Sequence, residues 1–166
     1  MNEINKIVLV GAGYWGTNIA KNLVKLNKKF YVCDSDKKKS ITLKKKFTNN
    51  IKINNDLLSL LKDKNNKYFF FATPPSKNFR LIKLALMNNK KIFIEKPGFK
   101  DINELNYLKK KFPNKVNEIN FGYIYLFNNH IKFLKKFIQN KKNGKILYVK
   151  FERQNLGPIR NDVDVS

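Results

Sequence analysis

Short runs of apolar residues alternate along the first two thirds of the chain with longer segments in which apolar side chains recur at helical spacing. The apolar runs predict buried strands at residues 6–10, 30–33, 51–53, 68–72 and 92–94. The segments that separate and follow them predict helices at residues 17–26, 36–47, 56–62, 78–87 and 101–112. Uniformly apolar strands that alternate with helices are typical of a parallel sheet with both faces covered. The pattern therefore predicts an α/β fold with a doubly wound parallel sheet.

Polar residues and prolines sharpen some of these boundaries. Asn55 is expected to cap the helix at 56–62, and Asp56 suits its first turn because a carboxylate is favoured at the positive end of a helix dipole. Pro74 and Pro75 end the strand at 68–72, because proline has no N–H group to donate to a sheet.

The pattern changes in the last third of the chain. Residues 116–125 predict a further strand, residues 129–139 a basic amphipathic helix, and residues 145–152 a strand whose side chains alternate between two faces. Such alternation is typical of a mostly antiparallel sheet with one solvated face. We therefore predict two domains, the first at residues 1–121 and the start of an incomplete α+β domain at residues 122–166.

Composition narrows the class of protein. The chain has 166 residues, of which 42% are hydrophobic, enough for one domain or for one domain and part of a second. No apolar run approaches the roughly 20 residues of a membrane span, and the N-terminus lacks the features of a signal peptide. The single cysteine, Cys33, excludes an intrachain disulfide, and no Cys/His cluster suggests zinc. We expect a cytoplasmic protein without a membrane partner or a bound metal.

The charge of the chain is strongly positive. Lys and Arg number 35 against 12 Asp and Glu, a net charge of +23, which is the electrostatic footprint of a nucleic-acid-binding protein. The lysines are nevertheless spread in short runs, at residues 37–39, 44–46, 109–111 and 141–142, and accompany abundant Asn, Ile and Phe. This mixture is typical of the residue usage of an AT-rich coding sequence. It favours the interpretation that the lysines form solvated basic faces and that the protein has no specific nucleic-acid partner. A nucleic-acid-binding module is the alternative, and its affinity would fall steeply with salt.

A glycine-rich segment, Gly11-Ala12-Gly13-Tyr14-Trp15-Gly16, joins the first predicted strand to the first helix and fits the pattern GxGxxG. In this position Gly11 permits a tight turn, Gly13 lets the backbone approach a pyrophosphate, and Gly16 allows close packing of helix on strand. The N–H groups and dipole of the helix N-terminus attract phosphate. The segment, with Tyr14 and Trp15 included, is the candidate phosphate-binding part of a dinucleotide site typical of the Rossmann fold.

An acidic residue, Asp34, follows the second predicted strand, 18 residues beyond Gly16 (34 − 16). A carboxylate there can accept both ribose hydroxyl groups of an adenosine and repels a 2′-phosphate, so it favours NAD over NADP. Nearby Ser35, Lys37 and Lys38 leave NADP as an alternative cofactor. The competing interpretation is a glycine turn followed by an ordinary surface aspartate.

Two further segments end predicted strands at the same edge of the sheet. Ala72-Thr73-Pro74 follows one strand and Glu95-Lys96-Pro97 follows the next, on the side where open α/β sheets bind ligands. Each has a plain alternative, a proline turn for the first and a solvated lysine for the second. The position of Lys96 favours an ammonium directed at the cofactor and substrate. We therefore add Ala72, Thr73, Pro74, Glu95 and Lys96 to the candidate cofactor site.

The order of these three motifs resembles the Gfo/Idh/MocA family of NAD(P)-dependent oxidoreductases, along the whole chain. Residues 122–128, 144–148 and 155–160 are similar to the branch that oxidises C3 of nucleotide-linked N-acetylated sugars or their uronic acids. The resemblance implies that Lys96 contacts the sugar and helps to handle the hydroxyl proton during hydride transfer. The family's TPxxxH motif is matched with Asn78 in place of its histidine, as a further cofactor-site position. The implied substrate contacts are Lys96, Tyr123, Asn155 and Arg160.

The resemblance also implies what the chain lacks. Members of the family are longer and carry an Asp and a His just beyond the segment matched by residues 157–160, whereas this sequence ends at Ser166, and its single histidine, His130, matches neither. Lys and His share the acid–base work in the family. We expect a small-molecule nucleotide-sugar substrate, a homo-oligomer only in a full-length form, and no turnover by this chain alone. The alternative to an enzyme is a cofactor-binding fragment from a truncated or split gene.

Overall fold

The structure of the chain is a computed structural model that describes residues 6–47, 49–152 and 154. The chain divides into two compact units, residues 1–123 and residues 124–166, and each is described by itself.

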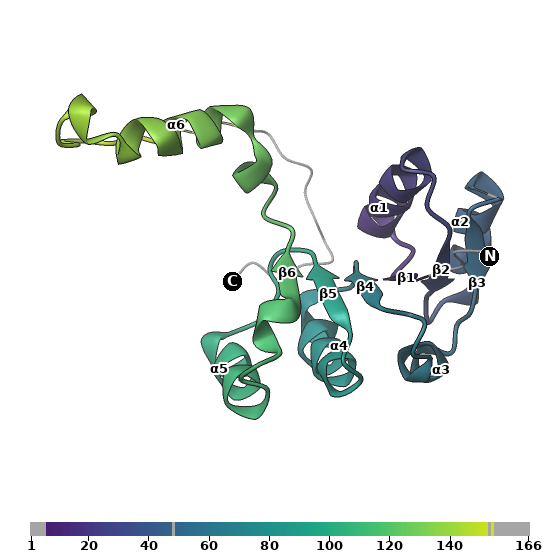
Figure 1. The fold of residues 1–166 in the computed structure, drawn as a ribbon. Coiled ribbons are helices and arrows are strands. Elements are labelled where there is room, and N and C mark those ends of the chain that lie inside the picture. Colours follow the sequence, from purple (N-terminus) through teal and green to yellow (C-terminus); the bar gives the residue numbers. More distant parts are fainter. Residues whose placement is uncertain (1–5, 48, 153, 155–166) are drawn as a thin grey trace. The chain divides into compact units, whose positions relative to one another are not determined.

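The first unit is built on a six-stranded parallel sheet with the strand order β3-β2-β1-β4-β5-β6 (Figure 1). The strands are β1 (Ile7–Val10), β2 (Phe30–Cys33), β3 (Ile51–Ile53), β4 (Tyr68–Phe71), β5 (Lys91–Ile94) and β6 (Ile119–Phe121). In the register of the sheet, Val10 lies beside Cys33 on one side and Phe71 on the other. The predicted α/β class with a doubly wound parallel sheet is confirmed, and this is a Rossmann fold.

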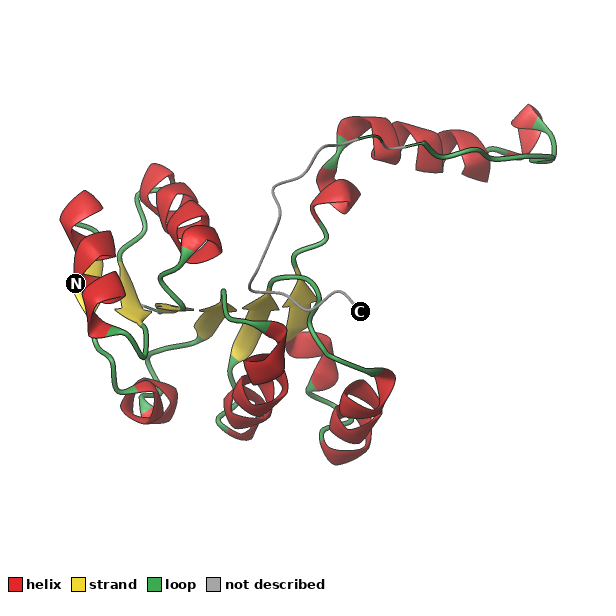
Figure 2. Cartoon of the chain, turned by 180° about the vertical axis from the view of Figure 1, so that it is seen from behind, coloured by secondary structure: helices red, strands yellow, loops and turns green. Residues whose placement is uncertain are grey.

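Helices cover the sheet in two layers (Figure 2). One face carries α1 (Tyr14–Lys25) and α2 (Lys37–Lys46), and the other carries α3 (Leu57–Lys62), α4 (Pro75–Met87) and α5 (Ile102–Lys111). Each helix is held to the sheet by an apolar stripe. In α4, for example, Ile82, Ala85 and Leu86 are buried at spacings of three and four residues.

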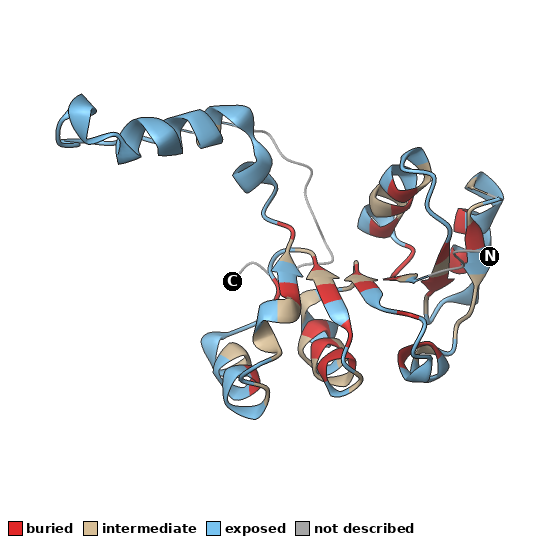
Figure 3. Cartoon of the chain, viewed as in Figure 1, coloured by how far each residue is buried: buried red, intermediate tan, exposed pale blue. Residues whose placement is uncertain are grey.

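The hydrophobic core forms two clusters, one on each face of the sheet (Figure 3). Val8, Phe69 and Phe71 belong to the cluster beneath α3, α4 and α5, whereas Leu9 and Phe30 belong to the one beneath α1 and α2. All five side chains are fully buried. Burying a side chain of this size contributes about 1.5–3 kcal/mol, so the sheet is stabilised from both faces.

Some helices begin at positions other than those predicted. Helix α1 starts at Tyr14 and not at residue 17, because Gly13 serves as its N-cap. Helix α4 starts at Pro75 and not at residue 78, since proline fits the first turn of a helix, where its missing N–H is not needed. The predicted cap of α3 is wrong: Asp56, and not Asn55, accepts the Ser59 N–H at 3.1 Å.

Two predicted strands are corrected by the structure. The strand predicted at residues 116–125 is limited to β6, which lies between the 3₁₀ turns Val116–Glu118 and Ile124–Phe127. Residues 145–152 form no strand, and Leu147 and Tyr148, on opposite faces of the expected strand, are both exposed, by 91% and 79%. A strand needs backbone partners on a neighbouring strand, and no pairing involves these residues in the described part of the chain.

The second unit contains α6 (Asn129–Gln139), which has the predicted bounds, and the 3₁₀ turn Lys141–Asn143. The side chain of Asn128 caps α6 by accepting the N–H groups of His130 and Ile131. The helix is amphipathic, yet Phe133 and Phe137 are exposed. Within the described ranges, the helices are all too short or too polar to cross a membrane.

Candidate functional site

The loops that follow β1 and β4 meet where the strand order reverses. From β1 the chain continues outward to β2 and β3, and from β4 it continues in the opposite direction to β5 and β6. Adjacent loops therefore diverge at the carboxyl ends of β1 and β4, which is where open α/β sheets form a ligand-binding crevice. The glycine turn follows β1, and Ala72 and Thr73 follow β4.

Gly11 and Gly16 are required by the close approach of backbone segments. Gly11 has φ of +98°, a conformation that favours glycine, and a Cβ there would overlap the carbonyl oxygen of Ala72. Its N–H donates to the Cys33 carbonyl at 2.9 Å, which ties the turn to β2. A Cβ on Gly16 would overlap the Gly11 carbonyl. These two glycines therefore hold the turn tightly against β4 and the start of α1.

Gly13 differs from the other two glycines. Its φ is −75°, it is exposed, and a Cβ there would meet no atom within 4 Å. It stands at the N-terminus of α1, where no side chain caps the helix and the first turn holds no acidic residue. The N–H groups and positive dipole end of α1 thus face open space, which suits a phosphate. The space at Gly13 is the feature that fits a pyrophosphate.

Asp34 is fixed beside the glycine turn by hydrogen bonds to both carboxylate oxygens. Oδ2 accepts the Ala12 N–H at 2.7 Å, and Oδ1 accepts the Asp36 N–H at 2.8 Å. Each oxygen retains a second lone pair that can accept a ribose hydroxyl group. The Asp34 N–H donates to Asn55 Oδ1 at 3.2 Å, and the same oxygen accepts the Ser40 hydroxyl at 3.0 Å. The carboxylate is therefore oriented before any ligand binds.

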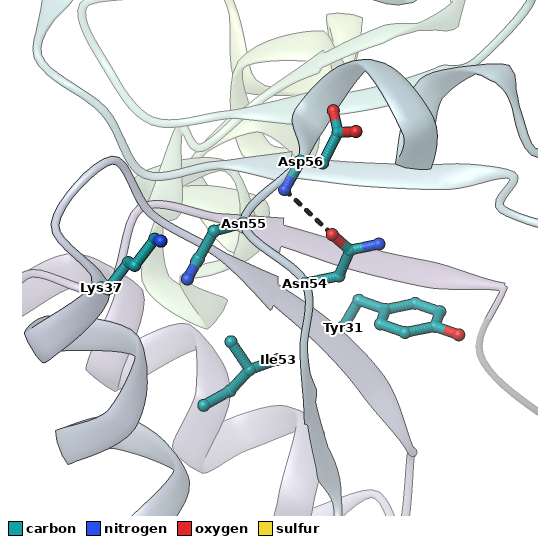
Figure 4. A pocket seen from close by; sticks show the side chains of 6 residues that line it. All are labelled: Tyr31, Lys37, Ile53, Asn54, Asn55 and Asp56. Atoms are coloured by element: carbon teal, nitrogen blue, oxygen red, sulfur yellow. Dashed lines mark hydrogen bonds between the residues drawn. The ribbon is translucent and has the colours of Figure 1, made fainter.

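A hollow of about 690 Å³ with a mixed polar and apolar lining opens beyond Asn55 (Figure 4). Its wall is built from β2, the end of β3, the start of α2 and the turn into α3. The lining residues are Tyr31, Lys37, Ile53, Asn54, Asn55 and Asp56. Asn54 Oδ1 accepts the Asp56 N–H at 2.9 Å, which shapes the turn into α3. Because Asn55 lines this hollow and also holds Asp34, the hollow adjoins the candidate ribose site.

Lys96 and Glu95 lie at the carboxyl end of β5. Lys96 is exposed, and Glu95 is half-buried, with a Gly122 Cβ position only 3.0 Å from its Oε2 atom. Burial raises the pKa of Glu95, and the Lys96 N–H and ammonium partly oppose this. A pKa above that of the unfolded chain means that stability falls as pH rises from 4.5 through the folded pKa. Burial of the ionised Glu95 carboxylate therefore lowers the stability of the fold, and this carboxylate lies next to Lys96 in the sequence.

The structure brings most of the predicted residues to one edge of the sheet. The glycine turn is bonded to Asp34 and lies in close contact with Ala72. On the same turn, the exposed rings of Tyr14 and Trp15 pack edge to face, with their centroids 5.4 Å apart. Pro74 is exposed after β4. Tyr123 is half-exposed, with its ring 5.7 Å from that of Phe121. Asn155 and Arg160 lie outside the described residues.

Two residues that shape the site carry no sequence motif that predicts this role. Asn55, interpreted as a helix cap, is the residue that holds Asp34 and Ser40. Gly122, which received no role, leaves room for the Glu95 carboxylate. The signal for Gly122 was its place directly after the last strand of the sheet. No group of metal-ligating side chains occurs among the described residues.

Cys33, at the end of β2, provides a test of the packing behind the site. Burial, together with the charges of Asp34 and Asp56, raises the pKa of its thiol from the ordinary 9.0 to about 11. At pH 8 this lowers the thiolate fraction about 100-fold, and the 4% exposed side chain is also inaccessible. We expect iodoacetamide to alkylate Cys33 at least about 100-fold more slowly in the folded protein than in guanidinium chloride. N-acetylcysteine in both solutions gives the control rates, and equal rates for Cys33 would contradict the packing.

One family of known proteins matches most of the first unit of the chain. The model of an oxidoreductase family with an NAD-binding Rossmann fold, GFO_IDH_MocA, matches residues 5–123. Among curated proteins, none matches the sequence significantly.

Solved structures share the fold. Myo-inositol dehydrogenase from Lactobacillus casei, in complex with NAD(H) and myo-inositol, superposes with a TM-score of 0.76 at 22% identity, over 83% of this chain and 42% of its own. Scyllo-inositol dehydrogenase from the same organism, with bound NAD(H) and scyllo-inositol, gives 0.69 at 19%, over 85% and 42%. The UDP-N-acetylglucosamine 3-dehydrogenase GnnA from Acidithiobacillus ferrooxidans gives 0.67 at 18%, over 78% and 42%. The chain thus spans about two fifths of these structures.

Proposed function

The chain belongs to the Gfo/Idh/MocA family of oxidoreductases with an NAD-binding Rossmann fold, and from this premise we propose that it serves the oxidation of a secondary hydroxyl group on a small molecule. The observation that carries the proposal is the link between Asp34 and the glycine turn. A carboxylate tied to the Ala12 N–H stands where it can accept ribose hydroxyl groups while the N-terminus of α1 faces the phosphates. When bound, NAD supplies the hydride acceptor.

The residues of the chain would then bind and orient. The N–H groups at the start of α1 hold the pyrophosphate, Asp34 holds the adenosine ribose, and Ala72, Thr73 and Pro74 line the crevice after β4. Lys96 contacts the substrate hydroxyl group and orients it or takes its proton.

We propose a nucleotide-linked N-acetyl sugar, or its uronic acid, as the substrate, with oxidation at C3. The motifs after residue 121 support this choice. The fold is shared both with a UDP-N-acetylglucosamine 3-dehydrogenase and with inositol dehydrogenases, so it supports a polyhydroxylated substrate in either case. Tyr123, Asn155 and Arg160 are the proposed substrate contacts in addition to Lys96. The single cysteine supports action in a reducing, cytoplasmic compartment.

A second candidate function, cofactor binding without turnover, is favoured by a specific observation. The chain spans about two fifths of the similar structures, and apolar side chains of residues 124–152 such as Phe127, Leu147 and Phe151 are more than 70% exposed. Exposed apolar surface of this kind invites association. We propose that further polypeptide, in this protein or in a partner chain, completes the substrate domain and its oligomer interface.

The test begins with the single tryptophan of the chain, Trp15, on the glycine turn. When Trp15 is excited during a titration with NADH, binding of NADH should quench the tryptophan emission and sensitise NADH fluorescence. Failure to bind NADH would refute the proposed function. NADH formation from NAD and UDP-N-acetylglucosamine, or its uronic acid, then separates the two candidates. Turnover that Lys96→Met abolishes supports the enzyme, whereas binding without turnover supports the cofactor-binding chain.

A further inference from the structure

Asn78 joins two loops that come from different strands. It lies in the first turn of α4 and is 1% exposed. Its Oδ1 accepts the Thr73 hydroxyl at 2.8 Å, on the loop after β4, and its Nδ2 donates to the Pro97 carbonyl at 3.3 Å, on the loop after β5. A single buried amide therefore spans the space between the two segments of the candidate site.

The burial of this amide makes both bonds important. A buried polar group without a partner costs about 1–3 kcal/mol, and asparagine is a poor helix former. Both polar atoms of the Asn78 side chain have hydrogen-bond partners. Among the described residues, the buried side-chain atom without a partner is Asn66 Oδ1. The hydrogen bonds of the Asn78 side chain thus go to groups outside its helix. Removal of either bonding group would leave one polar atom of the amide without a partner.

The bond to Pro97 restrains the peptide group on the C-terminal side of the Lys96-Pro97 pair. The proline ring fixes φ of Pro97, and the amide of Asn78 fixes the direction of its carbonyl group. The chain then enters Gly98, which is buried and where an added Cβ would overlap the Phe121 ring. The segment that carries Lys96 is therefore held from its C-terminal side by an amide that is also bonded to the Thr73 hydroxyl group.

We propose that Asn78 is a positioning residue for Lys96: it sets the place of the lysine relative to the β4 loop by bonding Thr73 and Pro97 together. The catalytic meaning of this role rests on the proposed function, in which Lys96 contacts the substrate hydroxyl group. Because an amide does not titrate, the link has the same strength at any pH at which the protein is folded. Positioning errors of about 1 Å at a reacting group can cost about 100-fold in rate.

The test measures whether a substitution on the β4 loop changes the environment of Lys96 through Asn78. The full chain is labelled with ¹⁵N, and the amide signals of Lys96 and Gly98 are followed in Thr73→Val, which keeps the shape of Thr73 but removes its hydroxyl group. We expect both signals to move, and to move further in Asn78→Ala. Asn88→Ala is the matched control, since Asn88 lies at the end of α4 and its Nδ2 donates to the Leu84 carbonyl of the same helix at 2.8 Å.

The outcomes separate this proposal from the proposed function. Unchanged Lys96 and Gly98 signals in a folded Thr73→Val protein would overturn the positioning role, as would equal changes in Asn88→Ala. If Asn78→Ala does not fold, Thr73→Val alone decides. NADH titration of the unaltered chain is run in parallel: absent binding refutes the proposed function, whereas the signal changes report the link between the loops independently.

Discussion

Gly13→Val is expected to weaken NADH binding at least about 100-fold, about 2.8 kcal/mol, while the protein stays folded. A Cβ on Gly13 would have no atom within 4 Å, and the φ of −75° suits any residue. The valine side chain would therefore occupy open space and would not clash with the protein. That space lies at the N-terminus of α1, where the pyrophosphate has to approach the backbone. Titration of Trp15 emission with NADH, alongside urea unfolding of both proteins, measures the two effects.

Gly16→Ala provides the contrasting control. Its methyl group would overlap the Gly11 carbonyl, so we expect this smaller substitution to destabilise the fold by about 1–3 kcal/mol, whereas Gly13→Val costs about 1 kcal/mol at the helix cap. The two glycines of one motif thus have opposite phenotypes. A folded Gly13→Val protein that binds NADH normally would refute the assignment of the glycine turn to the pyrophosphate.

The parts of the fold that sequence predicts well are those whose signal is local. Strand β2 has the predicted bounds because it is an apolar run between polar residues, and a buried parallel strand needs no other mark. Strand β3 also has the predicted bounds, although the exposed Lys52 separates its two isoleucines at the edge of the sheet. The segment at 145–152 shows the limit of this reasoning. Alternating side chains describe how a strand would face a core, but the backbone pairs only where another strand offers its N–H and carbonyl groups.

The candidate site divides in the same way. The glycine spacing and the acid after β2 lie within one βαβ unit, so their arrangement follows from sequence. The bonds that orient the site join residues 21 and 19 positions apart, Asp34 to Asn55 and Asn78 to Pro97, and no periodic pattern marks them. Asparagine is common throughout this chain, which hides the two that are buried or bonded across loops.

The preference for NAD over NADP should depend on Asp34. The unaltered chain is expected to bind NADH at least about 10-fold more tightly than NADPH, because a carboxylate and a 2′-phosphate at one place repel. Asp34→Ala should remove the preference and also weaken NADH binding by about 1.5–3 kcal/mol for each lost charged hydrogen bond. Titrations of both proteins with both reduced cofactors, read from Trp15 emission, give the ratio directly.

Asp36→Ala is the matched control, because it removes the same charge two residues away. The Asp36 N–H that holds Asp34 Oδ1 is a backbone group and survives the substitution, so the ribose site keeps its geometry. The side chain of Asp36 caps α2 by accepting the Lys38 N–H at 2.9 Å, and its loss should cost about 1 kcal/mol of stability. If the preference depended on the summed charge of this loop, Asp36→Ala would reduce it as Asp34→Ala does. We expect the ratio to survive in Asp36→Ala and vanish in Asp34→Ala, since only a carboxylate bonded to the glycine turn stands where the ribose must lie.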